Sequence, residues 1–258
     1  MTPKFIAIIP SRYGSSRFPG KPLVDIAGKM MIQRVYEQVV QAVDDVWVAT
    51  DDERIESAVL SFGGKVVMTS VDHRSGTDRC AEAVMKISKE TGKNFDVVIN
   101  VQGDEPFIQP EQIIDIQKPF LADPSTEIAT LIQHVYNLEV LLNPGETKVV
   151  LDIHGNAIYF SRLPIPMVAK SEQSEWIDKF NYFCHVGIYA YRTDILQKLS
   201  RLPEGNLERA ESLEQLRWLE NGYKIKTEIT DHISVGIDTP EELRKIVEEG
   251  VERYFGRR

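Results

Sequence analysis

The sequence predicts an α/β fold in which a mostly parallel sheet carries helices on both faces. Two observations support this prediction. Short apolar runs alternate with amphipathic helical patterns from residue 5 to residue 135, and the connections between them are short. Strands that are buried on both faces form uninterrupted apolar runs, and regular alternation with helices favours a parallel sheet.

The elements follow in order, each bounded by turn residues or by a change of period. Expected strands span 5–9, 46–49, 65–69, 96–101 and 128–135, and expected helices span 32–43, 55–62, 77–90 and 110–121. Beyond Asn143, strands at 148–153, 157–160 and 185–191 are expected to form an antiparallel insertion, with a loop at 167–180. A helix at 211–220 and strands at 224–229 and 233–237 follow. Thr239, Pro240 and Glu242 predict a capping box at the start of the last helix.

Composition excludes several classes of protein. The chain has 258 residues, 30 Lys+Arg and 39 Asp+Glu, and a net charge of −9, which argues against nucleic-acid binding. No apolar run approaches the ~18–20 residues of a membrane helix, so no membrane partner is expected. The N-terminal apolar run is too short for a signal peptide. The two cysteines, Cys80 and Cys184, make neither a disulfide scaffold nor a zinc cage, and we expect reduced thiols in the cytoplasm.

Positive charge is concentrated in the loop after the first strand, Ser11 to Lys21. Arg12, Arg17 and Lys21 accompany small hydroxyl residues such as Ser15 and two glycines. Backbone N–H groups in such a loop can hold phosphate oxygens, and arginine adds paired hydrogen bonds. The loop matches neither the P-loop nor the dinucleotide-binding pattern. It is therefore interpreted as an anion-binding loop rather than a basic turn.

A second polar cluster, His73 to Arg79, follows the third strand and precedes a helix. Ser75 or Thr77 is suited to cap that helix, and capping alone explains much of the pattern. The functional interpretation is that Ser75 and Arg79 recognise a nucleobase or phosphate. His73 is interpreted as an exposed loop residue.

A third cluster, Asn100 to Pro106, follows the fourth strand and carries Gln102, Asp104 and Glu105. A carboxylate that faces phosphates usually has a cation between them, and Mg²⁺ takes one or two carboxylates plus phosphate oxygens. Asp104 is therefore the candidate metal ligand. Asp238 either belongs to the cap of the last helix or, if the preceding strand joins the sheet, supplies a second carboxylate.

Five further residues lie in the second half of the chain: Arg162, His185, Tyr189, Glu214 and Gln215. Individually, each type is more often structural. Together they suit an acidic, polyhydroxylated substrate. Alternation along the strand places His185, Gly187, Tyr189 and Tyr191 on one face.

Seven segments in this order resemble the 3-deoxy-manno-octulosonate (Kdo) cytidylyltransferase family. They are Pro10–Pro22, Ser75–Arg79, Asn100–Pro106, Tyr159–Arg162, His185–Arg192, Leu213–Arg217 and Asp238–Glu242. The resemblance runs from about residue 4 to residue 250. It implies transfer of CMP from CTP to the anomeric hydroxyl of Kdo with release of pyrophosphate, in lipopolysaccharide biosynthesis. It also implies Mg²⁺, a cytoplasmic homodimer and a nucleotide-diphospho-sugar transferase-like fold.

The resemblance also implies a role for each matching residue. Arg12, Ser15, Arg17 and Lys21 would bind the triphosphate, and Ser75, Arg79 and Gln102 would bind the cytidine. Arg162, His185, Tyr189, Glu214 and Gln215 would form the sugar site. Asp104 and Asp238 would bind the metal and, with Lys21, act in catalysis. The chain contains no arrangement that argues for a nucleophilic Ser or Cys, so direct attack by the sugar hydroxyl is the simpler mechanism.

The same resemblance predicts one compact unit with three parts. Residues 1–142 form the nucleotide-binding part, 143–205 the inserted sugar-site and dimerisation segment, and 206–258 the return to the main domain. The alternatives are transfer to 8-amino-Kdo or to sialic acid, and Glu105 favours ordinary Kdo. A glycosyltransferase would carry an Asp-x-Asp motif in the N-terminal half, which has none. A nucleotide-binding protein without catalytic activity would be expected to lack Lys21 or one of the metal carboxylates, and this chain retains them.

Overall fold

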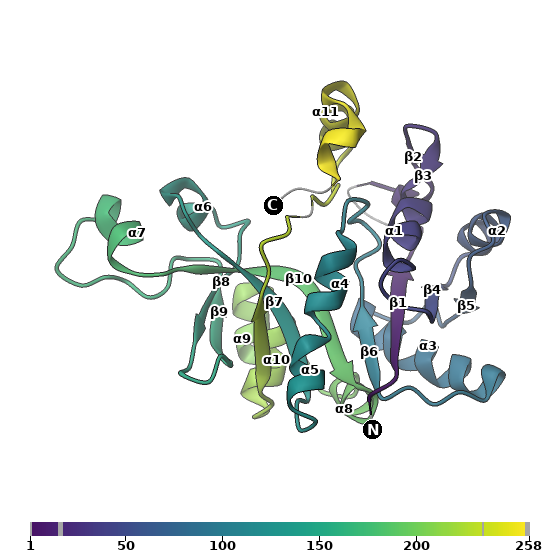
Figure 1. The fold of residues 1–258 in the computed structure, drawn as a ribbon, viewed down its shortest axis with the longest axis horizontal. Coiled ribbons are helices and arrows are strands. Elements are labelled where there is room, and N and C mark those ends of the chain that lie inside the picture. Colours follow the sequence, from purple (N-terminus) through teal and green to yellow (C-terminus); the bar gives the residue numbers. More distant parts are fainter. Residues whose placement is uncertain (1, 15–17, 234, 256–258) are drawn as a thin grey trace.

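The computed structural model describes residues 2–14, 18–233 and 235–255. Within them, the main sheet has the strand order β11-β7-β10-β6-β1-β4-β5 (Figure 1). These strands are β1 (Phe5–Ser11), β4 (Val46–Thr50), β5 (Val66–Met68), β6 (Val97–Asn100), β7 (Ile128–His134), β10 (Phe183–Arg192) and β11 (Ile225–Ile229). Neighbouring strands are parallel except at β10, which is antiparallel to both β6 and β7. The predicted mostly parallel sheet is confirmed.

Helices cover both faces of this sheet, as the sequence predicts. One face carries α3 (Gly76–Thr91), α8 (Thr193–Leu199), α9 (Asn206–Glu211) and α10 (Gln215–Glu220). The other carries α1 (Met31–Val39), α2 (Glu53–Ser61), α4 (Pro110–Asp115) and α5 (Lys118–Ala122). Along β1, Ile6 and Ile8 pack into the first apolar cluster, whereas Ala7 and Ile9 pack into the second. The uninterrupted apolar run of β1 therefore follows from burial on both faces.

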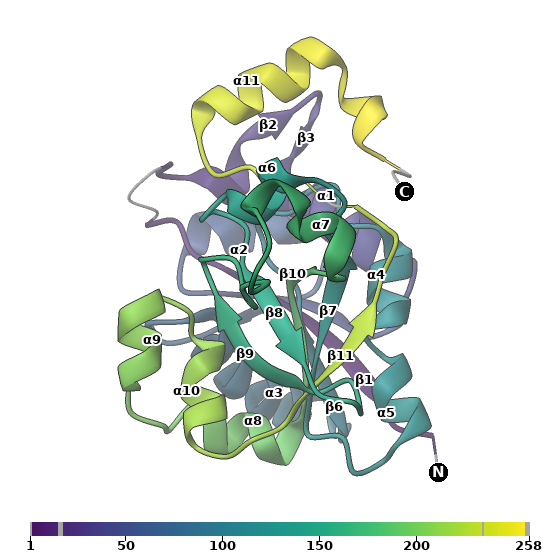
Figure 2. The ribbon, with the colours of Figure 1, turned by 90° about the vertical axis from the view of Figure 1, so that its left-hand side faces the viewer.

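A smaller antiparallel layer projects at one end of the molecule (Figures 1 and 2). It contains β8 (Lys148–Leu151) and β9 (Ala157–Ser161), with α6 (Leu138–Leu142) and α7 (Trp176–Lys179) beside them. β8 pairs with β9 and with the start of β10. β10 itself continues into the centre of the main sheet, so the segment 143–205 contributes to both layers. The division of the chain at 143 and 206 stays a prediction.

The last described elements lie above the carboxyl edge of the parallel strands (Figure 1). There α11 (Pro240–Glu249) and the hairpin β2 (Asp25–Ile26) and β3 (Lys29–Met30) share a third apolar cluster with Phe107 and Ile237. Short 3-10 helices span Lys21–Leu23, Gln173–Glu175 and Val251–Tyr254. The predicted capping box is confirmed: Thr239 Oγ1 accepts from the Glu242 N–H at 3.2 Å, and Glu242 Oε2 accepts from the Thr239 N–H at 3.1 Å.

Several boundaries differ from those expected. The helix expected at 110–121 is divided into α4 and α5, because Pro119 has no N–H for a continuous helix and its ring crowds the preceding turn. The helix expected at 211–220 begins only at Gln215, because residue 211 belongs to the preceding helix α9. Ser212 lies in the left-handed region with φ 53°, which ends α9 before α10 begins.

Two expected elements are wrong. The loop expected at 167–180 contains α7, because Trp176 and Ile177 pack against a small apolar cluster that includes Tyr182. The strand expected at 233–237 does not form in Ile233 or in residues 235–237, which the structure describes as irregular. None of the described helices combines the length and the apolar character needed to cross a membrane.

Candidate active site

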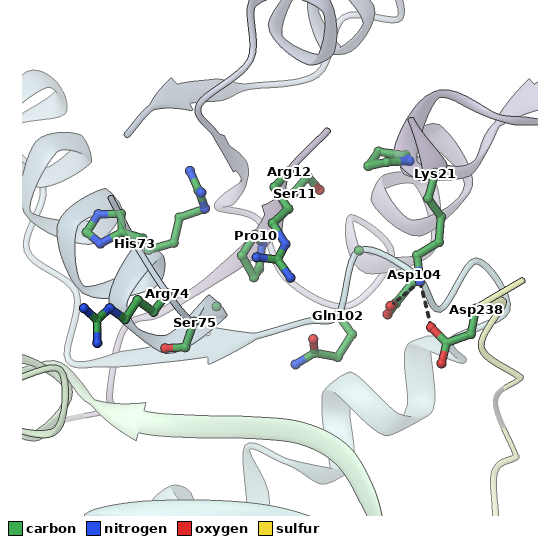
Figure 3. Close-up of a pocket in the computed structure, with 14 residues that line it drawn as sticks. Pro10, Ser11, Arg12, Lys21, His73, Arg74, Ser75, Gln102, Asp104 and Asp238 are labelled. Carbon is green, nitrogen blue, oxygen red and sulfur yellow. Dashed lines mark hydrogen bonds and ion pairs between the residues drawn. The ribbon is translucent and has the colours of Figure 1, made fainter. Parts of the chain in front are cut away.

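A cavity of about 240 Å³ lies at the carboxyl ends of β1 and β6, where the sheet prediction places ligands (Figure 3). It is lined by most of the predicted nucleotide and metal residues: Arg12, Lys21, Ser75, Arg79, Gln102, Asp104 and Asp238. Ser15 and Arg17 lie outside the described residues. Side chains from both ends of the chain therefore meet at one place.

The loops of the cavity approach each other closely because of one glycine. A Cβ on Gly103 would lie 2.8 Å from Ser11 Oγ and 3.0 Å from the Pro10 carbonyl oxygen. Gly103 therefore lets the loop after β6 rest directly on the end of β1. This contact places Asp104 opposite the loop that carries Lys21.

Lys21 joins the two predicted metal ligands. Its Nζ lies 2.6 Å from Asp104 Oδ2 and 2.9 Å from Asp238 Oδ1 (Figure 3). The Lys21 side chain is 11% exposed, compared with 36% for Asp104 and 43% for Asp238. An ammonium that contacts two carboxylates offsets the repulsion between them, which is strongest where water is excluded.

Asp238 reaches this position through backbone contacts, without a strand before it. The Ile237 N–H donates to the Asp104 carbonyl oxygen at 2.9 Å, and the Ile237 side chain is fully buried in the third apolar cluster. On the other side, Glu242 Oε2 accepts from the Asp238 N–H at 2.6 Å. Asp238 therefore adjoins the helix cap and lies near Asp104, although the strand on which its role as a second carboxylate was conditional does not form in the described residues.

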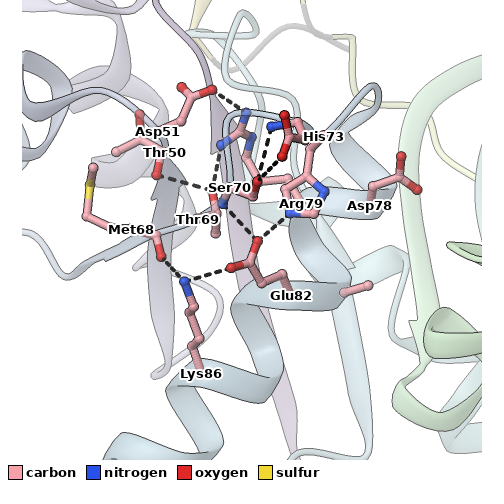
Figure 4. A network of polar contacts seen from close by, with 12 residues as sticks. Thr50, Asp51, Met68, Thr69, Ser70, His73, Asp78, Arg79, Glu82 and Lys86 are labelled. Carbon is pink, nitrogen blue, oxygen red and sulfur yellow. Dashed lines mark hydrogen bonds and ion pairs between the residues drawn. The ribbon is translucent and has the colours of Figure 1, made fainter.

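Arg79 lines the cavity, but two nitrogens of its guanidinium bind neighbouring side chains. Nη1 donates to Thr69 Oγ1 at 2.5 Å and Nη2 donates to Asp51 Oδ2 at 2.9 Å (Figure 4). Only 3% of Arg79 is exposed. Asp51 is not among the residues predicted for the site, although the polar Thr-Asp-Asp segment at the end of β4 is a signal of the same kind as the other clusters. Ser75 caps α3 by accepting from the Asp78 N–H at 3.2 Å, as the capping interpretation expected.

The rim of the cavity next to Arg79 is held by Glu82 (Figure 4). Its carboxylate accepts from the Ser70 N–H at 2.9 Å, pairs with Lys86 at 2.6 Å and contacts His73 Nε2. Burial alone raises the pKa of a carboxyl group, but these three donors outweigh it and lower the pKa of Glu82 to about 2. His73 is thus bound to α3 and is not an exposed loop residue as expected.

The predicted sugar residues of β10 form an aromatic column. The ring of Tyr189 stacks at 5.9 Å on Tyr191 and lies 5.1 Å from His185, and Trp218 contacts it edge-on at 5.0 Å. A bulge between Val186 and Tyr189 adds two residues to β10 relative to β7. Because the addition is even, His185 and Tyr189 stay on the same face, as predicted.

His185 is neutral in this position. Its Nε2 lies 2.9 Å from Thr130 Oγ1, and burial lowers its pKa to about 3. A neutral imidazole offers a hydrogen bond to a sugar hydroxyl, whereas it supplies no positive charge for a carboxylate.

Glu214 precedes α10 and Gln215 begins it, and the pair adjoins the cavity through α3. Thr77 Oγ1 donates to Glu214 Oε2 at 2.9 Å, and Thr77 is two residues from Ser75 at the cavity wall. Burial raises the pKa of Glu214, against the hydrogen bonds from Ser75 and Thr77 that lower it. Gln215 is 5% exposed. The pair is therefore buried beside the first turn of α3.

Arg162 differs from the other predicted sugar residues, because its side chain binds backbone carbonyls. Nε donates to the Glu211 oxygen at 2.7 Å, and the two terminal nitrogens donate to Ser212 at 3.3 Å and Pro144 at 3.2 Å. These bonds fix the end of α9 just before Glu214. The structure thus gives Arg162 a positioning contact, and its contact with sugar stays a prediction.

The α/β fold and the cavity at the carboxyl ends of its strands are those of a nucleotidyltransferase, and the family comparison supports this class. A model of the family described as Cytidylyltransferase matches residues 6–225. The 3-deoxy-manno-octulosonate cytidylyltransferase of Bacteroides thetaiotaomicron is 56% identical over 244 residues, which cover 93% of this chain and 96% of that protein. The enzyme of the same name from Parabacteroides distasonis is 56% identical over 246 residues, which cover 94% and 96%. The chain therefore belongs to the 3-deoxy-manno-octulosonate cytidylyltransferase family.

A solved structure supports the same family. CMP:2-keto-3-deoxy-manno-octonic acid synthetase in complex with CTP superposes with a TM-score of 0.87 and 45% identity, and the match covers 97% of this chain and 99% of the other. A cytidylyltransferase from Leptospira borgpetersenii, with a TM-score of 0.58 and 15% identity, shares the fold.

The neutral state of His185 predicts a pH dependence of stability. Its pKa falls from an ordinary 6.5 to about 3 on folding, so the unfolded chain binds the proton first as the pH decreases. This contribution to stability is complete above about 6.5 and is lost as the pH falls toward about 3. We expect His185→Gln to flatten that part of the pH profile, measured by urea unfolding at several pH values.

The exposed His154 in the β8–β9 turn provides a matched control, because His154→Gln removes a histidine that the fold does not bury. Parallel pH profiles for the wild type and His185→Gln would show that His185 is protonated equally in both states.

Proposed function

We propose that this chain transfers CMP from CTP to the anomeric hydroxyl of Kdo and releases pyrophosphate. The observation that carries the proposal is the convergence of Arg12, Lys21, Asp104 and Asp238 in one cavity of a chain of this family. Cations there suit a triphosphate, and the relatives named for Kdo support that sugar over 8-amino-Kdo and sialic acid. Glu105 is consistent with the choice.

The carboxylate pair fits Mg²⁺, which we propose as the cofactor. One oxygen from Asp104 and one from Asp238 lie within 3 Å of a single point, the Lys21 nitrogen. Among the described residues, no group of three or more His, Cys, Asp or Glu side chains is placed to hold a metal. Two carboxylates suffice for Mg²⁺ when phosphate oxygens and water complete its octahedral shell. The ion would neutralise phosphate charge when bound.

We assign the reaction to positioning and charge supplied by the residues of the cavity and by the predicted sugar residues. The sugar hydroxyl oxygen forms a bond to the α-phosphorus and releases its proton, the bond from that phosphorus to the bridging oxygen breaks, and pyrophosphate leaves. Arg12 and Lys21 neutralise the charge that moves onto the leaving oxygens. Neutral His185 and buried Glu214 orient the sugar by hydrogen bonds. Holding both reactants in line supplies much of the rate increase.

The direct test is release of pyrophosphate from CTP in the presence of Mg²⁺. We expect release with Kdo and much slower release with 8-amino-Kdo or sialic acid, measured side by side with a no-sugar control. Absence of release with all three sugars would contradict the proposed activity. Faster release with 8-amino-Kdo would reassign the sugar.

Asp104 is expected to be essential for turnover. Asp104→Asn keeps the shape of the side chain but removes a negative charge, and we expect the rate to fall by roughly 100-fold or more, the scale of losing one electrostatic group. Circular dichroism would check the fold. Asp44→Asn, at an exposed position in the turn before β4, is the matched control. A rate near that of wild type would exclude Asp104 from the metal site.

We also propose a homodimer that forms through the projecting antiparallel layer. Several large apolar side chains of this layer are exposed, among them Ile153, Ile158, Leu163 and Met167. A contiguous apolar patch is typical of an interface, and we propose that these side chains form one. The same proposal includes a cytoplasmic location and a role in lipopolysaccharide biosynthesis. Cys80 and Cys184, both buried and unpaired, are compatible with a reducing compartment.

Sedimentation velocity tests the dimer. The wild type is expected to sediment as a dimer, and Leu163→Asp to shift toward the monomer, because a charge would be buried at the interface. Leu60→Asp, on an exposed position of α2, is the control. A monomeric wild type would refute the dimer.

A further inference from the structure

The Lys21 ammonium lies at the point where a metal bound by Asp104 and Asp238 would also lie. Its nitrogen contacts one oxygen of each carboxylate, at 2.6 Å and 2.9 Å (Figure 3). Cations compete for such a pair, because the attraction of both carboxylates is greatest at the same place. Lys21 and a divalent ion would therefore compete for the same position between the two carboxylates.

The backbone that carries Lys21 is firmly placed, so the ammonium is delivered to this point by the fold. Lys21 begins a 3-10 turn in which its N–H donates to the Phe18 oxygen at 3.1 Å and the Val24 N–H donates to the Lys21 oxygen at 3.2 Å. Pro22, which fixes its own φ, is buried in the next position. The flexible part is therefore the four-carbon side chain, which can turn its ammonium without moving the loop.

We propose that Lys21 occupies the carboxylate pair in place of the metal until a nucleoside triphosphate arrives. The proposal rests on the proposed function. A triphosphate offers the ammonium another anionic partner in the same cavity and offers the metal additional oxygen ligands. Nucleotide binding and metal binding then favour each other, and this coupling is reciprocal. Metal binding to the protein without nucleotide is correspondingly weak.

The test measures binding of Mn²⁺ alone, as a paramagnetic probe, to nucleotide-free protein by electron paramagnetic resonance. Lys21→Met and Lys21→Gln are expected to bind Mn²⁺ more tightly than wild type by about tenfold or more, within the usual range of coupling between sites. Arg12→Met is the matched control, because it removes a positive charge from the same cavity and leaves the Lys21 bridge in place. We expect its Mn²⁺ affinity to stay within about threefold of wild type, below that coupling range.

Two outcomes would overturn the proposal. Equal or weaker Mn²⁺ binding by both Lys21 variants would show that the lysine does not compete with the metal. Equal tightening by Arg12→Met would show a general effect of charge in the cavity. Lys21→Gln keeps an N–H donor for the carboxylates, so it provides the measurement if Lys21→Met fails to fold.

The experiment separates this inference from the proposed function. Turnover of wild-type protein with CTP and Kdo tests the function and does not depend on metal affinity without nucleotide. Normal turnover with no gain in Mn²⁺ affinity contradicts only the competition. A clear gain with no turnover contradicts only the proposed activity.

Discussion

The site depends on holding two carboxylates of like charge close together. Asp104 and Asp238 come from distant parts of the chain, and each contacts Lys21, which is 83 positions from one and 217 from the other. The hydrogen bond from the Ile237 N–H to the Asp104 oxygen joins the same two loops through the backbone. Repulsion between the carboxylates is thus opposed by a cation and by the packing of α11. The Lys21 ion pairs and the packing of α11 therefore act together to hold the two carboxylates in place.

The antiparallel strand β10 places two of the predicted sugar residues in the sheet. Placed between β6 and β7, it brings His185 and Tyr189 into the core of the sheet, and its bulge preserves their common face. Thr77, in the first turn of α3 beside the cavity, donates a hydrogen bond to Glu214. The N-terminus of α3 therefore contacts both the cavity and Glu214, one of the expected sugar residues.

The sequence predicted the parts of the site that depend on strand order. Polar residues after apolar runs, such as Arg12 and Asp104, were expected at the carboxyl ends of parallel strands, and they lie there. Asp51 follows β4 in the same way and binds Arg79, but its role depends on a partner 28 positions away that no local pattern reveals. Arg162 is the opposite case. Its position after a strand predicted a ligand contact, but its side chain binds backbone carbonyls.

The sequence by itself determined the alternating elements, the capped last helix and the family, because these depend on local periodicity and on ordered motifs. Only the tertiary structure decided how the ends of the chain meet. The segment before Asp238 forms no strand in its described residues, and hydrogen bonds of the Ile237 and Asp238 N–H groups fix the position of Asp238. Such long-range contacts carry no periodic signal, since each requires only that two distant groups come within hydrogen-bond distance. The position of Lys21 between two carboxylates is the clearest example.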